Sequence, residues 1–274
     1  FAARGWPRLH TRFGLHSGEA VVGNVGTLRQ PTTLAQYQAG TALPLHLFSH
    51  LEQATQWQSS ISDRPFETGW GGRLADLLNA QNENNRISMA ITLSGNNSFQ
   101  IGRHVAQFSV GQGGPTTLNL GGRPEFFSNR RQALATAMNA PQSNLLAAAF
   151  GQMTGRTLED SDFLTVALRS APALVTSFPG TLTGGNLRMV ARLISIASAL
   201  GLKRQIFFAS LGGFDTHSAQ VDSGDTSQGA HADLLRTLAE AIKAFFDDLD
   251  KMGIGDMALA CTFSEFGRCA KENG

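Results

Sequence analysis

Long apolar runs are missing from this sequence of 274 residues. A membrane-spanning helix needs roughly 18 or more consecutive apolar residues. The most apolar helical candidate, 187–202, is interrupted by Arg188 and Arg192, so we predict no membrane span. An excess of one charge is missing as well, because 22 basic and 21 acidic residues leave a net charge of +1. Nothing in this balance steers the protein toward nucleic acid or an anionic membrane.

Several common motifs are also absent. Cysteine is scarce, and the spacing of Cys261 and Cys269 matches no zinc motif; we expect Cys261 on a buried strand and Cys269 in a loop. Glycine is plentiful, but no glycine cluster completes a phosphate-binding loop or a dinucleotide fingerprint. The sequence contains no G-x-S-x-G nucleophile elbow and no H-E-x-x-H zinc motif. Nucleotide binding and serine-type hydrolysis therefore receive no support from motifs.

Processing signals are missing at both ends. The sequence begins at Phe1 without a charged-then-apolar signal region, and it stops at Gly274 without a closing helix or a polar tail. We therefore expect an incomplete piece of a larger protein. Its composition is globular, and its length suits one α/β domain or two small ones.

What is present is an alternation of helices and strands. Periodicity predicts helices over 49–59, 72–80, 129–138, 142–152, 159–170, 185–201 and 230–252. Strands are expected at 87–93, 205–211 and 257–263, with short strands and loops between 100 and 124. The C-terminal third reads helix, strand, loop, helix, strand, loop, which is typical of a doubly wound α/β fold. We therefore predict that 205–211 and 257–263 are neighbouring parallel strands.

Polar, acid-bearing loops follow these two predicted strands. The first loop reads Gly212-Gly-Phe-Asp-Thr-His217 and the second reads Ser264-Glu-Phe-Gly-Arg268. Ligands of open α/β sheets bind outside the carboxyl ends of the parallel strands. The pattern therefore places a candidate site at these two loops.

A metal site is one interpretation of the first loop. Asp215 and His217 offer an oxygen and an imidazole ligand, and His231 at the start of the next helix completes a candidate set. Such donors suit zinc, manganese or iron(II). The alternative is a hydrogen-bonded structural loop, which the spacing alone favours. The isolated His46, His50 and His104 are interpreted as structural or surface residues.

The second loop offers Thr262, Ser264, Glu265 and Arg268 as supporting or anion-binding groups. An acid and an arginine at a strand end can orient a metal ligand or hold a phosphate or sulfate group, because the guanidinium is a bidentate donor. The alternative is local: Ser264 caps a helix, and Glu265 pairs with Arg268 three residues later.

Several motifs together resemble the domain-of-unknown-function 1501 family over residues 20–274. They are Asn24-Val-Gly, Leu47-Phe-Ser-His50, Trp57-Gln58, Gly69-Trp-Gly-Gly-Arg-Leu-Ala-Asp76, Gly212-Gly-Phe-Asp-Thr-His217 and Thr262-Phe-Ser-Glu-Phe-Gly-Arg268 with Glu272-Asn273. The family is similar to the alkaline-phosphatase and sulfatase superfamily. The resemblance implies an incomplete alkaline-phosphatase-like doubly wound sheet with helices on both faces. It also implies a twin-arginine-exported, periplasmic parent that hydrolyses small phosphate or sulfate esters with bound metal.

The same resemblance implies that Asp215 and His217 are one remaining part of a metal site. The other ligands and the nucleophile are expected outside the chain, so we expect the fragment itself to be inactive. A non-catalytic exported binding or scaffold protein is an alternative. The sequence indicates no oligomeric state.

A second resemblance covers residues 4–27. Arg4-Gly-Trp-Pro-Arg8 and the stretch from Thr11 to Thr27 resemble the middle of a class III adenylate/guanylate cyclase domain. We therefore predict a foreign N-terminal segment over 1–27 and a phosphatase/sulfatase-like domain over 28–274. The remnant of a nucleotide cyclase fusion is a further alternative.

Overall fold

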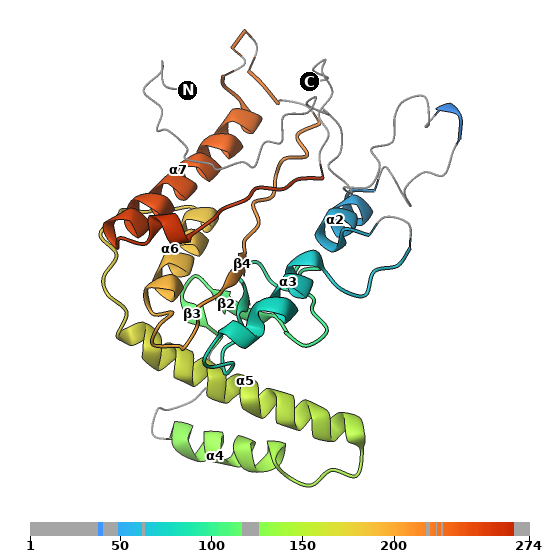
Figure 1. Ribbon diagram of the computed structural model, residues 1–274, viewed down its shortest axis with the longest axis vertical. Helices are drawn as coiled ribbons and strands as arrows, with labels where there is room; N and C mark the ends of the chain where they lie inside the picture. The colour runs from blue at the N-terminus through green and yellow to red at the C-terminus, as the bar shows by residue number, and fades with distance from the viewer. Residues whose placement is uncertain are drawn as a thin grey trace.

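The computed structural model describes residues 38–40, 49–61, 64–116, 126–217, 220–222, 224–225 and 227–265. The predicted foreign segment 1–27, Arg268 and Cys269 lie outside these residues. Figure 1 shows a small sheet flanked by helices, with a helical hairpin projecting from one end.

Within the described residues, four short strands form the sheet, in the order β3-β2-β1-β4. The strands are β1 (Ala90–Thr92), β2 (Phe108–Gly111), β3 (Gly114–Pro115) and β4 (Ile206–Phe208). The central strand β1 pairs in parallel with β2 and with β4, whereas β3 is antiparallel to β2. Ile91 lies opposite Phe108 and Phe207. All three residues of β1 are buried, as expected for a strand covered on both faces.

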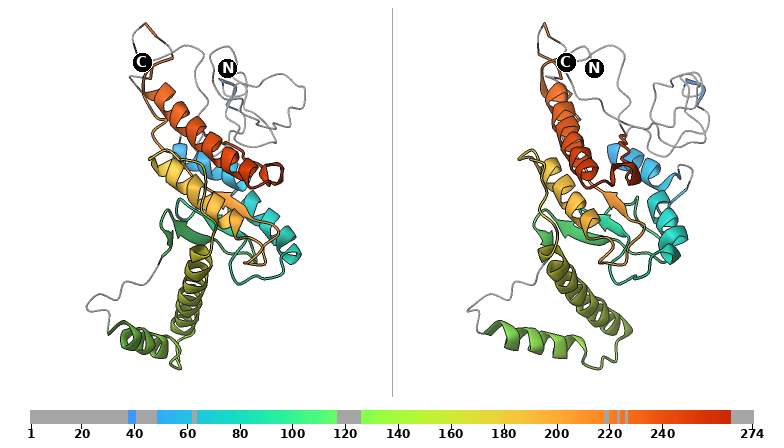
Figure 2. Two further views of the ribbon diagram at one scale, coloured as in Figure 1. Left: turned by 90° about the vertical axis from the view of Figure 1, so that its left-hand side faces the viewer. Right: turned by 60° about the vertical axis from the view of Figure 1, so that its left-hand side comes forward.

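Helices cover both faces of this sheet. The described helices are α2 (His50–Ser59), α3 (Trp70–Leu78), α4 (Phe127–Met138), α5 (Leu145–Arg169), α6 (Leu182–Ser195) and α7 (Ala230–Lys251), with short 3-10 turns η2 (Asn79–Gln81) and η4 (Gly255–Met257). Of these, α4 packs on α5 and does not cover the sheet. One face packs Ile91 and Val110 against α5, α6 and α7. The other packs Met89 and Ala90 against Ala75 of α3. Figure 2 shows α3 and α6 on opposite sides of the strands. The α/β fold with helices on both faces is therefore confirmed.

The predicted strand 257–263 is wrong. After η4 the chain runs without regular structure from Ala258 to Ser264 and crosses toward α2 (Figure 1). Met257 and Leu259 are 81% and 72% exposed, and Cys261 is exposed rather than buried. The segment leaves the sheet because its Phe263 packs among the aromatic rings of α2 and α3. The strand 206–208 instead has β1 as its parallel neighbour.

The two helices expected at 142–152 and 159–170 form one continuous helix, α5. The helix α4 packs against the outer half of α5, and both helices project from the sheet (Figures 1 and 2). A Cβ atom added to Gly151 would lie 2.5 Å from the Met138 carbonyl oxygen. A glycine in the middle of α5 therefore permits close approach of α4 and does not end the helix. No helix among the described residues is long and apolar enough to span a membrane.

Candidate functional site

The loops that follow β1 and β4 are tied together at one edge of the sheet. Leu93 donates its backbone N–H to the Phe208 carbonyl at 2.8 Å, and the Ser210 N–H donates to Ser94 Oγ at 2.8 Å. The two strands are parallel, so both carboxyl ends meet here. This edge is where an open α/β sheet presents its ligand site.

Asp215 and His217 lie together in the loop after β4. His217 Nε2 is 2.9 Å from Asp215 Oδ1. His217 also has a φ of 39°, in the left-handed region that few residues other than glycine adopt. Strained backbone of this kind concentrates at binding and catalytic sites. The loop therefore holds an acid and an imidazole against each other at some conformational cost.

His50 connects this pair to the C-terminal loop. Its Nε2 atom is 3.7 Å from Asp215 Oδ2, and its Nδ1 atom is 3.6 Å from Glu265 Oε1. The side chains of His50 and Asp215 are about half exposed, at 53% and 47%, whereas that of Glu265 is 23% exposed. The cluster is therefore open to solvent on the Asp215 side and sheltered on the Glu265 side.

The C-terminal loop is held in place by aromatic packing. Phe263 stacks on Trp57, with ring centroids 5.3 Å apart, and meets Trp70 edge-on at 5.6 Å. The Trp70 indole N–H donates to the Trp57 carbonyl at 3.1 Å, so the two tryptophans are themselves joined. Trp57 and His50 both belong to α2. Residues 263–265 are therefore attached to this helix at two points.

Not every predicted site residue joins the cluster. His231 packs its ring edge-on against Phe214 at 5.8 Å, and its backbone N–H donates to the Gln220 carbonyl, so these contacts place it beside the loop. Thr262 and Ser264 are exposed in the segment that carries Glu265. Arg268 lies outside the described residues, as does its predicted pairing with Glu265.

His50 is the residue that sequence reasoning missed. A lone histidine predicts a structural or surface residue, because no nearby ligand type repeats with it. Its one signal was the motif Leu47-Phe-Ser-His50. Ser49 accepts from the Glu52 N–H and so caps α2, which places His50 on the first turn, facing the sheet edge.

The donor atoms fit a divalent metal in their chemistry. One carboxylate and two imidazoles from Asp215, His217 and His50 are ligands that zinc, manganese and iron(II) accept. In the part of the chain that the structure describes, no three such side chains form a ready metal-binding group. A bound ion would therefore have to draw the His50 imidazole toward Asp215.

The family of the chain follows from comparison with known proteins. A family model described as "Protein of unknown function (DUF1501)" matches residues 7–274. The chain belongs to the DUF1501 family. No curated protein and no solved structure matches the chain. The cyclase resemblance of residues 4–27 stays a prediction, and so does the boundary at residue 27.

In this DUF1501 protein, the motif Gly69–Asp76 is structural. A Cβ atom on Gly72 would lie 2.1 Å from the Ile101 carbonyl oxygen, and one on Gly71 would lie 2.4 Å from the Phe99 ring. The motif's last residue, Asp76, accepts the backbone N–H groups of the turn 103–105. The motif therefore fastens α3 to the loop 98–105.

The turn 103–105 lowers the pKa of the Asp76 carboxyl group. Burial raises its pKa, but the backbone N–H donors of Val105, Arg103 and His104, together with the charge of the nearby His104, outweigh burial. The pKa of Asp76 consequently lies below its ordinary value of 3.8. Asp76 is therefore an ionised anchor at neutral pH, with no sign of a role as a proton donor.

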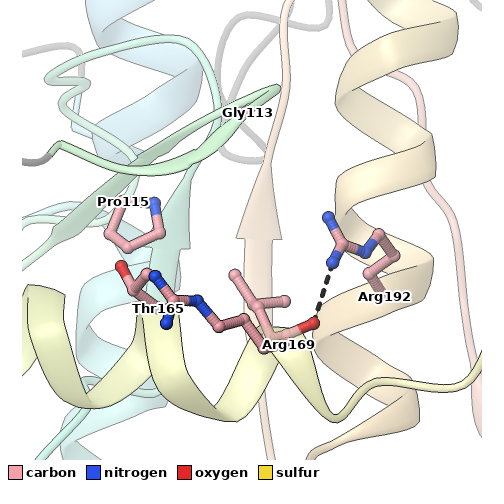
Figure 3. Close-up of a pocket in the computed structure, with 6 residues that line it drawn as sticks. Gly113, Pro115, Thr165, Arg169 and Arg192 are labelled. Carbon is pink, nitrogen blue, oxygen red and sulfur yellow. Dashed lines mark hydrogen bonds between the residues drawn. The ribbon is translucent and has the colours of Figure 1, made fainter.

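A cavity of about 300 Å³ lies elsewhere in the DUF1501 chain, between α5, α6 and β3 (Figure 3). It is lined by Gly113, Pro115, Thr165, Leu168, Arg169 and Arg192. Arg192 donates to the Leu168 carbonyl at 2.9 Å. Because the last carbonyls of a helix lack partners within it, Arg192 caps the end of α5. Thr165 donates to the Ser161 carbonyl at 2.7 Å. The Arg192 guanidinium and the Thr165 hydroxyl that line the cavity therefore make hydrogen bonds to helix carbonyl groups.

Proposed function

We propose that this DUF1501 chain carries part of a divalent-metal site of a phosphate or sulfate ester hydrolase. The observation that carries the proposal is the contact between Asp215 and His217 at the carboxyl end of β4. A carboxylate and an imidazole in contact, next to a second acid-bearing loop, match the requirements of such a site.

Each residue has a distinct role in this proposal. Asp215 and His217 hold the ion, and Glu265 supports the site from the second loop. Ser264 and Thr262 are exposed nearby and offer hydroxyl groups to an anionic ester. A divalent ion bound here would supply Lewis-acid stabilisation of the ester oxygens. The alkaline-phosphatase-like form of the α/β sheet and twin-arginine export rest on the family resemblance described above.

Metal titration tests the proposal. We expect zinc and manganese to bind the chain weakly in calorimetry, because the Asp215 side chain is half exposed and that of His217 is mostly exposed. Asp215→Ala and His217→Ala should each weaken binding further. His104→Ala is a matched control, since His104 is an exposed histidine in the turn 103–105 beside Asp76. Binding that is the same in all variants would remove the assignment.

Binding without catalysis is a second candidate function. The open cluster favours it, because the side chains of Asp215 and His217 are 47% and 79% exposed and a solvent-filled site stabilises a transition state poorly. Assays with an aryl phosphate and an aryl sulfate separate the two functions. We expect little or no turnover from this chain, and robust metal-dependent turnover would establish the hydrolase.

A further inference from the structure

We infer that His50 is a ligand of the proposed metal site and that Glu265 orients it. The inference rests on the proposed metal site and extends it in two ways. His50 takes the place of His231 as the second imidazole. Glu265 contacts and orients His50, and does not itself bind the ion or the substrate.

The two nitrogens of His50 face two different carboxylates. Nε2 is 3.7 Å from Asp215 Oδ2, and Nδ1 is 3.6 Å from Glu265 Oε1. Metal-binding histidines commonly coordinate through one nitrogen and donate the N–H of the other to a carboxylate, which fixes the tautomer and the ring orientation. Glu265 is the more sheltered of the two acids. The arrangement therefore assigns Nε2 to the ion and the Nδ1 N–H to Glu265.

The spacing around Asp215 supports this assignment. Tetrahedral zinc with bonds of about 2.0–2.2 Å places neighbouring donor atoms roughly 3.3–3.6 Å apart. The distance from Asp215 Oδ1 to His217 Nε2 is 2.9 Å, just below this range. The distance from Asp215 Oδ2 to His50 Nε2 is 3.7 Å, just above it. The two distances end on different oxygens of Asp215, and no three such side chains of the described residues are already placed to hold an ion, so binding requires His50 to move toward the pair.

The scaffold around His50 supports a precise position. His50 occupies the first turn of α2, which Ser49 caps. Trp57 lies seven positions later on the same helix, so the two side chains share a face. Phe263 stacks on Trp57 while Glu265, two residues later, meets His50. The aromatic stack therefore sets the position of the carboxylate that orients the ligand.

Metal affinity of single variants tests the inference. Zinc binding is measured by calorimetry, and cobalt binding by the visible absorption that reports on ligand geometry. We expect Glu265→Gln to weaken zinc binding about 10-fold, within the range known for groups that orient ligands. His50→Gln should weaken it more, by about 100-fold or greater, because the ion loses a ligand. Each variant should also change the cobalt spectrum, whereas His231→Ala and His104→Ala should leave both readouts unchanged.

The outcomes separate this inference from the proposed function. Loss of binding in Asp215→Ala and His217→Ala with full binding in His50→Gln would overturn the role of His50 and leave the metal site standing. Equal binding in all variants would overturn both. Circular dichroism and tryptophan fluorescence without metal check that each variant is folded; if His50→Gln is not folded, His50→Asn provides the same test. A weakened Glu265→Gln with an unchanged cobalt spectrum would contradict the orienting role.

Discussion

The Phe263 ring lies 5.3 Å from the Trp57 ring, and the two planes are inclined by only 13°. This stack is the reason why an apolar segment leaves the sheet and crosses to α2. It also positions Glu265 against His50. The candidate site therefore depends on a contact between two residues that carry no site chemistry themselves.

Removing this stack should loosen the C-terminal loop. We expect Phe263→Ala to lower the free energy of unfolding by about 1–2 kcal/mol, because it loses two aromatic contacts of a half-exposed ring. Urea unfolding followed by tryptophan fluorescence measures the loss. Leu259→Ala is the control in the same segment, since Leu259 is 72% exposed and should change stability by less than about 0.5 kcal/mol. Equal effects of both variants would contradict the anchoring role.

Replacing a glycine with alanine should have opposite effects on stability at two helical positions, because α3 approaches the loop 98–102 closely and the surroundings of Gly155 in α5 are open. Gly72→Ala should destabilise the protein by about 2–4 kcal/mol, because its Cβ would collide with the Ile101 backbone. Gly155→Ala in α5 should stabilise it by about 0.5–1 kcal/mol, because a Cβ there meets nothing within 4 Å. Thermal unfolding of both variants is the measurement, and a tolerated Gly72→Ala would refute the packing argument.

Asp76 should make stability depend on acid pH. Its pKa in the folded protein is lowered from 3.8, so ionised Asp76 stabilises the fold fully above that value. The contribution should disappear as the pH falls below 3.8 toward the folded pKa. Urea unfolding at a series of pH values measures it. Asp76→Asn should be less stable at neutral pH and should lack this component; an unchanged pH profile would show that Asp76 does not contribute.

Asp248 on α7 should tolerate loss of charge but not loss of its acceptor. It is fully buried, and its Oδ1 atom accepts the backbone N–H groups of Val175 and Thr176. Asp248→Ala should cost about 1–3 kcal/mol, because two backbone donors lose their buried acceptor. Asp248→Asn keeps an acceptor oxygen and should cost clearly less. Chemical unfolding compares them, and equal losses would mean that the charge itself matters.

Much of the fold was predictable because it follows from periodicity. The helices at 50–59, 127–138 and 230–251 and the strand at 206–208 lie where the sequence patterns place them. The apolar pattern of 257–263 is compatible with a strand and equally with an irregular segment that docks through the Phe263 ring, so the sequence alone could not separate the two. The break predicted at 153–158 is absent, because α5 continues through this stretch. The close approach of α4 at Gly151 is a contact that local sequence does not reveal.

The candidate site was predictable in part. The sequence predicts Asp215 and Glu265 at the ends of two neighbouring strands, but 257–263 is not a strand, and the two acids are linked instead through His50. His50 could not be placed, because its contacts with these residues join distant parts of the chain and leave no periodic signal. His231 was expected from its nearness in sequence to Asp215, but its ring packs against Phe214.

X-ray absorption of the zinc-loaded protein tests the central claim most directly, because it counts the nitrogen ligands of the ion. The account predicts two imidazoles, from His50 and His217, together with oxygen ligands at about 2.0–2.2 Å that include Asp215. His217→Ala and His50→Gln should each remove one imidazole from the spectrum. Zinc surrounded by oxygen alone, or an imidazole count that neither variant alters, would contradict the account.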